Sequence, residues 1–115
     1  MENHHITQKP YVFSGNFALA EIPLDITSMS IAIAYVTTRY PTEGYSCLTS
    51  DMVVAVLSGK GWLHRAGNVQ TRVKPGDIIS IKKGEEYFWE VEGKKQLRLL
   101  AINSPPFNPN DRKTK

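Results

Sequence analysis

The stretch KPGDIISIKKGEEYFWEV, residues 74–91, contains two strand patterns, each preceded by a turn. Residues 75–77 (Pro-Gly-Asp) and 82–84 (Lys-Lys-Gly) favour turns, because proline presets one backbone angle and glycine accepts positive φ. The β-rich runs 77–82 and 86–92 follow these turns directly. The stretch therefore predicts a strand, a tight turn and a second strand.

The second of these runs assigns its side chains to two faces. Successive residues of a strand point to opposite sides of a sheet, so Tyr87, Trp89 and Val91 share one face. Three glutamates and Phe88 occupy the other face. We expect the Tyr-Trp-Val face to point into the protein.

The same alternation of short β-rich runs and turn residues extends along the chain in both directions. Glycine, asparagine and aspartate turns recur every eight to ten residues, and no segment of helical length has a 3.6-residue apolar period. About eight strands are predicted, at 17–22, 29–37, 52–57, 61–65, 69–73, 77–82, 86–92 and 96–103. This spacing is typical of an all-β antiparallel sandwich or barrel.

The length and composition indicate one domain. The chain has 115 residues, 41% of them hydrophobic and 22% charged, which is ordinary for a globular protein. No internal repeat or low-complexity linker divides it. We expect a flexible N-terminus at 1–10, a barrel at 11–107 and a flexible basic tail at 108–115.

Charge and hydropathy argue against several classes of partner. The net charge of +3 comes from scattered basic residues, which indicates no nucleic-acid partner. The longest apolar runs, 31–36 and 52–57, are far shorter than the ~20 residues of a membrane-spanning helix. The first ten residues lack the apolar stretch of a signal peptide, and the lone Cys47 fits a reducing compartment. We expect a cytoplasmic protein that does not enter the membrane.

The turn spacing resembles the second sequence motif of the cupins. That motif has the form Gly, five residues, Pro, one residue, Gly, two residues, His, three residues, Asn. Gly76, Lys82, Gly84, Tyr87 and Val91 fall on these places, so both glycines are kept and the proline, histidine and asparagine are replaced. The resemblance implies a single-domain double-stranded β-helix, the jelly-roll barrel of the cupins, around a central pocket.

The first cupin motif also has a counterpart, counted back from Gly59. It normally carries a His-x-His pair, a glutamate about five residues later and a glycine seven residues after that. Met52 falls on the glutamate place, and Cys47 and Tyr45 fall on the histidine places. The resemblance covers residues 37–103, and every metal ligand that it implies is replaced.

These replacements predict a protein without a metal or other cofactor. Iron, manganese, nickel and zinc require imidazole, carboxylate or thiolate donors that converge on one point. Tyrosine, methionine and one cysteine do not supply such a set. An alternative site built from Cys47, Asp51 and His64 stays open, because sliding the first motif by one residue brings in Asp51.

The aromatic residues at and near the former ligand places suggest a pocket instead. Aromatic walls with a few polar tips suit a small ring-shaped or planar ligand, including a sugar. The candidate ligand-binding residues are Tyr45, Cys47, Met52, Trp62, His64, Tyr87 and Trp89. The alternative is that these large side chains fill the barrel and leave no pocket.

Three functions follow from these possibilities. The preferred one is metal-independent binding of a small molecule; the alternatives are an isomerase or lyase that uses Tyr87, Tyr45 or Cys47, and a structural domain without a pocket. Catalysis by Tyr87 would require a lowered pKa. The resemblance to small cupins also implies a homodimer, with open strand edges or an apolar outer face covered by the partner, and Phe88 and residues 17–24 as contributors.

Overall fold

The computed structural model describes residues 11–14, 17–22, 25–41, 43–105 and 113–114, with the backbone alone described for the first and last of these segments. The N-terminal segment expected to be flexible, 1–10, lies outside the described residues. All regular secondary structure in the described part is β-strand. It includes no helix long and apolar enough to cross a bilayer.

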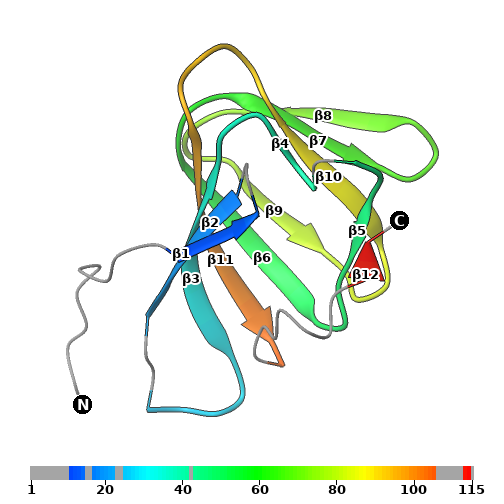
Figure 1. Cartoon of the computed structure of the whole chain (residues 1–115). Coiled ribbons are helices and arrows are strands. Elements are labelled where there is room, and N and C mark those ends of the chain that lie inside the picture. Colours follow the sequence, from blue (N-terminus) through cyan, green and yellow to red (C-terminus); the bar gives the residue numbers. More distant parts are fainter. Residues whose placement is uncertain (1–10, 15–16, 23–24, 42, 106–112, 115) are drawn as a thin grey trace.

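One sheet of six antiparallel strands forms one layer of the molecule (Figure 1). Its spatial order is β1-β2-β3-β11-β6-β9. The strands are β1 (Tyr11–Ser14), β2 (Phe17–Ile22), β3 (Ser30–Val36), β11 (Leu97–Ser104), β6 (Asp51–Ser58) and β9 (Ile78–Ile81).

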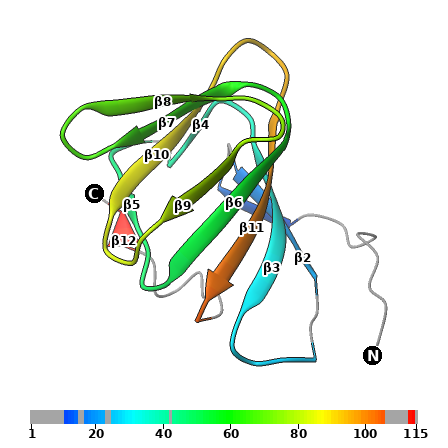
Figure 2. The ribbon, with the colours of Figure 1, turned by 180° about the vertical axis from the view of Figure 1, so that it is seen from behind.

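A second sheet lies across from the first, as the front and rear views both show (Figures 1 and 2). Its order is β12-β5-β10-β7-β8, and a further short strand, β4, also pairs with β10. The strands are β4 (Arg39–Tyr40), β5 (Ser46–Cys47), β7 (Gly61–Arg65), β8 (Val69–Val73), β10 (Glu86–Val91) and β12 (Lys113–Thr114). From β5 onward the chain passes repeatedly between the two sheets, which makes the molecule an all-β jelly roll.

All eight predicted strands are present, with bounds within a residue or two of the prediction. The four strands that the sequence did not indicate are β1, β4, β5 and β12, each of two to four residues, too short to show a two-residue period. One of these, β12, lies within the predicted tail 108–115 and pairs with β5. The rest of that tail lies outside the described residues.

The two sheets contribute different side chains to the core between them. The predicted inner face of β10 is confirmed, because Tyr87 and Trp89 are buried and Val91 packs against the core. The first sheet supplies smaller residues, among them Val54 and Leu99. The rings of β10 therefore face mostly aliphatic side chains of the first sheet, with Phe17 of β2 as the aromatic exception.

Candidate functional site

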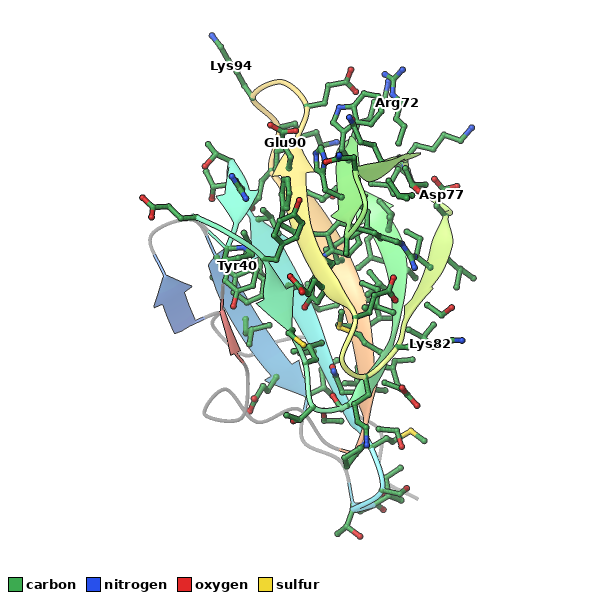
Figure 3. All side chains as sticks on the ribbon, turned by 90° about the vertical axis from the view of Figure 1, so that its right-hand side faces the viewer. Tyr40, Arg72, Asp77, Lys82, Glu90 and Lys94 are labelled. Atoms are coloured by element: carbon green, nitrogen blue, oxygen red, sulfur yellow. The ribbon has the colours of Figure 1, made fainter. Side chains whose placement is uncertain are left out.

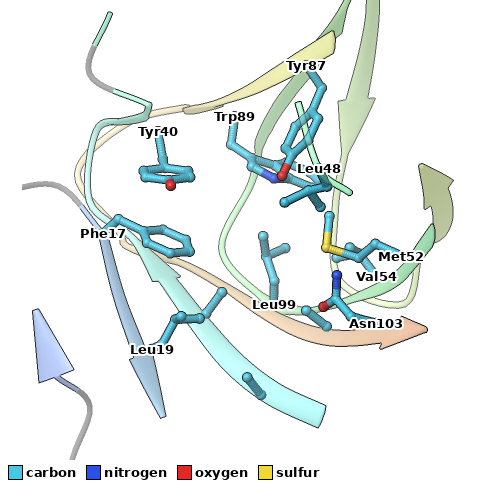
Figure 4. A pocket seen from close by; sticks show the side chains of 13 residues that line it. Phe17, Leu19, Tyr40, Leu48, Met52, Val54, Tyr87, Trp89, Leu99 and Asn103 are labelled. Atoms are coloured by element: carbon cyan, nitrogen blue, oxygen red, sulfur yellow. The ribbon is translucent and has the colours of Figure 1, made fainter. Parts of the chain in front are cut away.

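A cavity of about 40 Å³, counted as the space open to the centres of water molecules, lies between the two sheets (Figure 4). The rings of Tyr87, Trp89 and Tyr40 form the wall on the side of the second sheet. Opposite them the wall includes alanines of the first sheet, Ala32 and Ala101 among them. Large rings facing methyl groups leave a space that larger aliphatic side chains would fill.

Tyr87 and Asn103 bring polar atoms to this mostly apolar space, beside the polar atoms of the Tyr40 and Trp89 rings. The hydroxyl of Tyr87 points into it (Figure 4). The buried amide of Asn103, on β11, also lines it, and Asn103 Nδ2 donates a hydrogen bond of 3.0 Å to Ser50 Oγ. A ligand in the cavity would therefore meet a phenol and a carboxamide among rings and methyl groups.

The protonation state of Tyr87 follows from its surroundings. Burial raises the pKa of the Tyr87 phenol well above its ordinary value. Ser46 acts in the opposite direction, but Ser46 Oγ has no hydrogen bond of good geometry, so we treat its effect as weak. Cys47 raises the pKa slightly further. Tyr87 therefore keeps its proton at neutral pH, and the lowered pKa that a general base needs is absent.

Two aromatic pairs shape the cavity. Phe17 and Tyr40 stack with ring centroids 3.8 Å apart and planes at 19°. Tyr87 and Trp89 meet edge to face, with centroids 6.5 Å apart and planes at 76°. Such geometries stabilise aromatic pairs, so both pairs hold their rings in fixed orientations.

Three of the seven candidate site residues come together at the cavity. Tyr87, Trp89 and Met52 all line it, from β10 and β6. The other four, Tyr45, Cys47, Trp62 and His64, do not line it and are half-buried.

The expected positions of Trp62 and His64 are corrected by the alternation in β7. Leu63 is fully buried, so its two neighbours along the strand point outward. The ring of His64 stacks on Phe88 at 4.1 Å, and His64 Nε2 lies 2.9 Å from Glu90 Oε1. Trp62 lies beneath the guanidinium of Arg72, at 5.8 Å from the ring centroid.

The expected positions of Cys47 and Tyr45 are also corrected. Alternate residues from Ser46 to Val56 are buried, and Ser46 is the residue paired with Tyr87. Cys47 lies an odd number of residues before Met52, so continuous two-residue alternation places the two on opposite faces. Tyr45 instead meets Phe88 edge to face on the outer side, at 5.1 Å.

The residues present do not fit the metal that the cupin resemblance implies. Within the described part of the chain, no three His, Cys, Asp or Glu side chains gather to hold an ion. The alternative set of Cys47, Asp51 and His64 is not assembled, because His64 bonds Glu90 and Asp51 Oδ1 accepts the Lys83 N–H at 2.8 Å. The cavity itself offers the protonated phenol of Tyr87, a thioether and an amide, which are poor ligands for these metals.

The candidate list from the sequence omitted ten residues of the cavity wall, and Phe17, Tyr40 and Asn103 are the aromatic and polar ones among these ten. Phe17 and Asn103 stand within predicted strands, and the alternation of those strands could have placed both inside. Tyr40 lies on the two-residue β4, where no periodic signal exists.

Known structures share this architecture although their sequences differ widely. No protein-family profile and no curated protein matches the chain. Ectoine synthase from P. lautus superimposes with a TM-score of 0.77 at 14% identity, covering 100% of this chain and 90% of that one. A variant of Pac13 from Streptomyces, a nucleoside dehydratase, in complex with uridine gives a TM-score of 0.80 at 12% identity, covering 100% of this chain and 91% of that one.

A third similar structure carries the name of the fold. The cupin domain of Cnp3 from Schizosaccharomyces pombe gives a TM-score of 0.70 at 15% identity, covering 86% of this chain and 69% of that one. The other two structures share the same fold. Identities this low establish architecture and not activity. The chain therefore has the cupin fold, the jelly roll that its sequence motifs resemble.

Proposed function

We propose that the protein binds a small, flat organic molecule in the cavity between its two sheets, without a metal ion. The observation that carries this proposal is the cavity wall. It combines aromatic rings, small methyl groups and two inward polar side chains, Tyr87 and Asn103. Apolar concave walls with few polar groups are the usual form of a small-molecule site.

The polar groups define what such a ligand would carry. Tyr87 keeps its proton and offers a hydroxyl that both donates and accepts, and Asn103 offers an amide beside Ser50. A planar ring with a carbonyl or hydroxyl group would match both. Uridine, which Pac13 binds, contains a ring of this kind, and the likeness of fold supports including pyrimidines among the compounds tested.

The cavity must enlarge to admit a whole ring. Its 40 Å³ corresponds to a few water molecules, since one water needs about 10–15 Å³ on this measure. Met52 has an unbranched side chain with several rotatable bonds, so its movement is the least costly way to open the space. If the wall stays closed, the chain is a scaffold domain without a ligand, the third possibility that the sequence left open.

An isomerase or lyase that works in the same cavity is the second candidate. Ectoine synthase and the dehydratase Pac13 are both enzymes, which favours this candidate. In such an enzyme Tyr87 would hold a substrate oxygen by hydrogen bonding, because its raised pKa opposes the role of base. Cys47 and Tyr45, outside the cavity, would have no part in the reaction.

The test uses two tyrosines that differ in position. Uracil, uridine, benzoate and p-cresol are each titrated into the protein, and binding is followed by tryptophan fluorescence and thermal shift. Tyr87→Phe removes one cavity hydroxyl and should weaken binding of a retained compound by roughly 1–2 kcal/mol. Tyr45→Phe removes the same atom from the outer face and should leave affinity unchanged. Absence of binding by all four compounds, or equal effects of both substitutions, would refute the proposal.

A further inference from the structure

A basic depression lies on the surface of the barrel, away from the cavity. It consists of two adjoining hollows of about 340 and 380 Å³ that share Lys60 and Arg72 in their walls. We call the two together the basic hollow. Its lining residues are Gly59, Lys60, Arg72, Lys74, Pro75, Glu92 and Lys95.

Two of the turns that build the basic hollow are locked together by close backbone contact. The β6–β7 turn carries Gly59 and Lys60, and the β10–β11 turn carries Glu92 and Lys95. A Cβ on Gly59 would lie 2.5 Å from the carbonyl oxygen of Gln96, so only glycine permits this approach. The Glu92 N–H also donates to the Lys60 carbonyl at 2.9 Å.

The third turn, between β8 and β9, is held to the same framework. The Gly76 N–H donates to the Val56 carbonyl and the Val56 N–H donates to the Asp77 carbonyl, both at 2.9 Å. Within the turn, Asp77 Oδ2 accepts the Lys74 N–H at 2.9 Å. The backbone that supports the three lysines is therefore fixed before any ligand arrives.

The charges of the basic hollow are unbalanced. Four cationic side chains and one carboxylate line it. That carboxylate, Glu92, is engaged by Arg72, whose Nη2 donates to both of its oxygens at 3.0 and 2.9 Å. Within the part of the chain that the structure describes, none of the three lysines forms an ion pair.

The ion pair with Glu92 orients Arg72 but uses only one nitrogen of its guanidinium group. Both bonds use one nitrogen of a guanidinium that has five N–H donors, and the group also lies over the ring of Trp62. The remaining donors of Arg72 are thus presented beside the lysine ammonium groups, an arrangement suited to phosphate oxygens.

We propose that the basic hollow binds a small multivalent anion of the diphosphate type. Two hollows sharing Lys60 and Arg72, with Lys95 in one and Lys74 in the other, provide two neighbouring places for negative groups. A single carboxylate would satisfy only a fraction of these cations. This inference is independent of the ligand proposed for the cavity.

The distribution of the other lysines favours a small anion over a nucleic-acid strand. Lys82 lies well away from Arg72 and Lys94 (Figure 3). Two carboxylates lie at its turn, since Glu85 within the turn accepts the Lys82 N–H and Asp51 of β6 accepts the Lys83 N–H. Among the residues that the structure describes, the basic hollow is therefore separate from Lys82 and Lys83 and does not join them in a continuous cationic track of the kind that follows a phosphate backbone.

The test is calorimetric titration of the full chain with inorganic pyrophosphate at low ionic strength. The double variant Lys60→Gln, Lys95→Gln should weaken binding at least about tenfold, because two charges facing the anion are lost. The control, Lys82→Gln with Lys83→Gln, makes the same change in net charge outside the basic hollow. It should alter the affinity by less than about twofold, with both variants shown to be folded by circular dichroism.

Other outcomes would overturn the proposal. These are absence of pyrophosphate binding by the unmodified chain, equal weakening in the two double variants, or acetate binding as tightly as pyrophosphate at matched ionic strength. Single-stranded RNA bound in preference to pyrophosphate would also contradict a small-anion site. Tyr87→Phe is expected to leave pyrophosphate affinity unchanged. The proposal of an anion site and the proposal of a ligand in the cavity can therefore be tested separately.

Discussion

Replacement of Tyr87 by phenylalanine should change how the stability of the protein depends on alkaline pH. Tyrosine in an unfolded chain ionises near pH 10, whereas burial raises the pKa of Tyr87 in the folded protein well above that value. Above pH 10 the folded state therefore binds more protons at this site than the unfolded state. The stabilisation from Tyr87 is fully present below pH 10 and is lost as pH rises further.

The size of this pH dependence follows from the single proton that Tyr87 loses on unfolding at high pH. The free energy of unfolding should fall by up to about 1.4 kcal/mol per pH unit from Tyr87 alone, and by about 1.6 kcal/mol between pH 10 and 11.5, because the unfolded tyrosine is only half ionised at pH 10. Tyr87→Phe has no proton to lose, so its stability should fall less steeply. Lysine titration affects both proteins alike and cancels in the difference.

The assay is urea denaturation followed by circular dichroism at several pH values from 8 to about 11.5. The unmodified protein, Tyr87→Phe and Tyr45→Phe are compared, with Tyr45→Phe expected to follow the unmodified protein because its hydroxyl lies outside the cavity. If all three lose stability with the same slope, Tyr87 is not desolvated in the folded protein. That result would refute the raised pKa of Tyr87 in the folded protein.

Three further predictions address the metal, the assembly and the turns. Because the His, Cys, Asp and Glu side chains of the described residues do not converge, the purified protein should hold no stoichiometric transition metal, and a chelator should not change its Tm. One equivalent of iron, manganese, nickel or zinc per chain, whose removal by chelator also lowers the Tm, would contradict this prediction. We propose that a second copy covers the outer face of the first sheet, where Val53, Leu57 and Ile78 are exposed, so light scattering should give about twice the 12.9 kDa of one chain, and a monomer mass would refute it. Gly59→Ala should lower the free energy of unfolding by roughly 1–3 kcal/mol more than Gly67→Ala does, because both glycines have positive φ but only a Cβ at Gly59 would collide with backbone. Equal decreases in the two variants, measured by urea denaturation, would show that the turn adjusts to the added methyl group.

The fold could be predicted because its signals are local. The main strands are bounded by turn residues, and in β6, β7, β10 and β11 the buried residues occupy alternate positions, so the sequence pattern of these strands indicates which side chains, such as Leu63 and Val54, point inward. The shortest strands have no such period. They are specified by partners distant in sequence, as Ser46 is by Tyr87.

The site was less predictable because motif counting and strand alternation disagree within it. Tyr87, Trp89 and Met52 satisfy both criteria and line the cavity. Cys47 satisfies only the count from Gly59, and continuous alternation turns it outward. Where a motif has lost the ligands that once fixed its geometry, the alternation of buried residues is the better guide.

The sequence predicts Phe88 as a contributor to a dimer interface. In the structure its ring contacts residues of its own chain, namely Arg39 at 3.9 Å, His64 and Tyr45. A ring occupied in this way by its own chain has little surface left for another. The exposed side chains of the first sheet, with Ile78 at 73%, are better placed for that contact.

The alanines opposite the aromatic rings limit the stability that this barrel can reach while its cavity stays open. An unfilled volume of 40 Å³ corresponds to about 1 kcal/mol of lost packing, at about 24 cal/mol per Å³. Valine in place of Ala34, another alanine of the cavity wall, would recover part of that packing and would occupy the space that we propose for a ligand ring. Larger side chains at these alanine positions should therefore raise the stability of the protein and remove the space for the proposed ligand. A screen for heat-resistant variants would select barrels with a filled cavity.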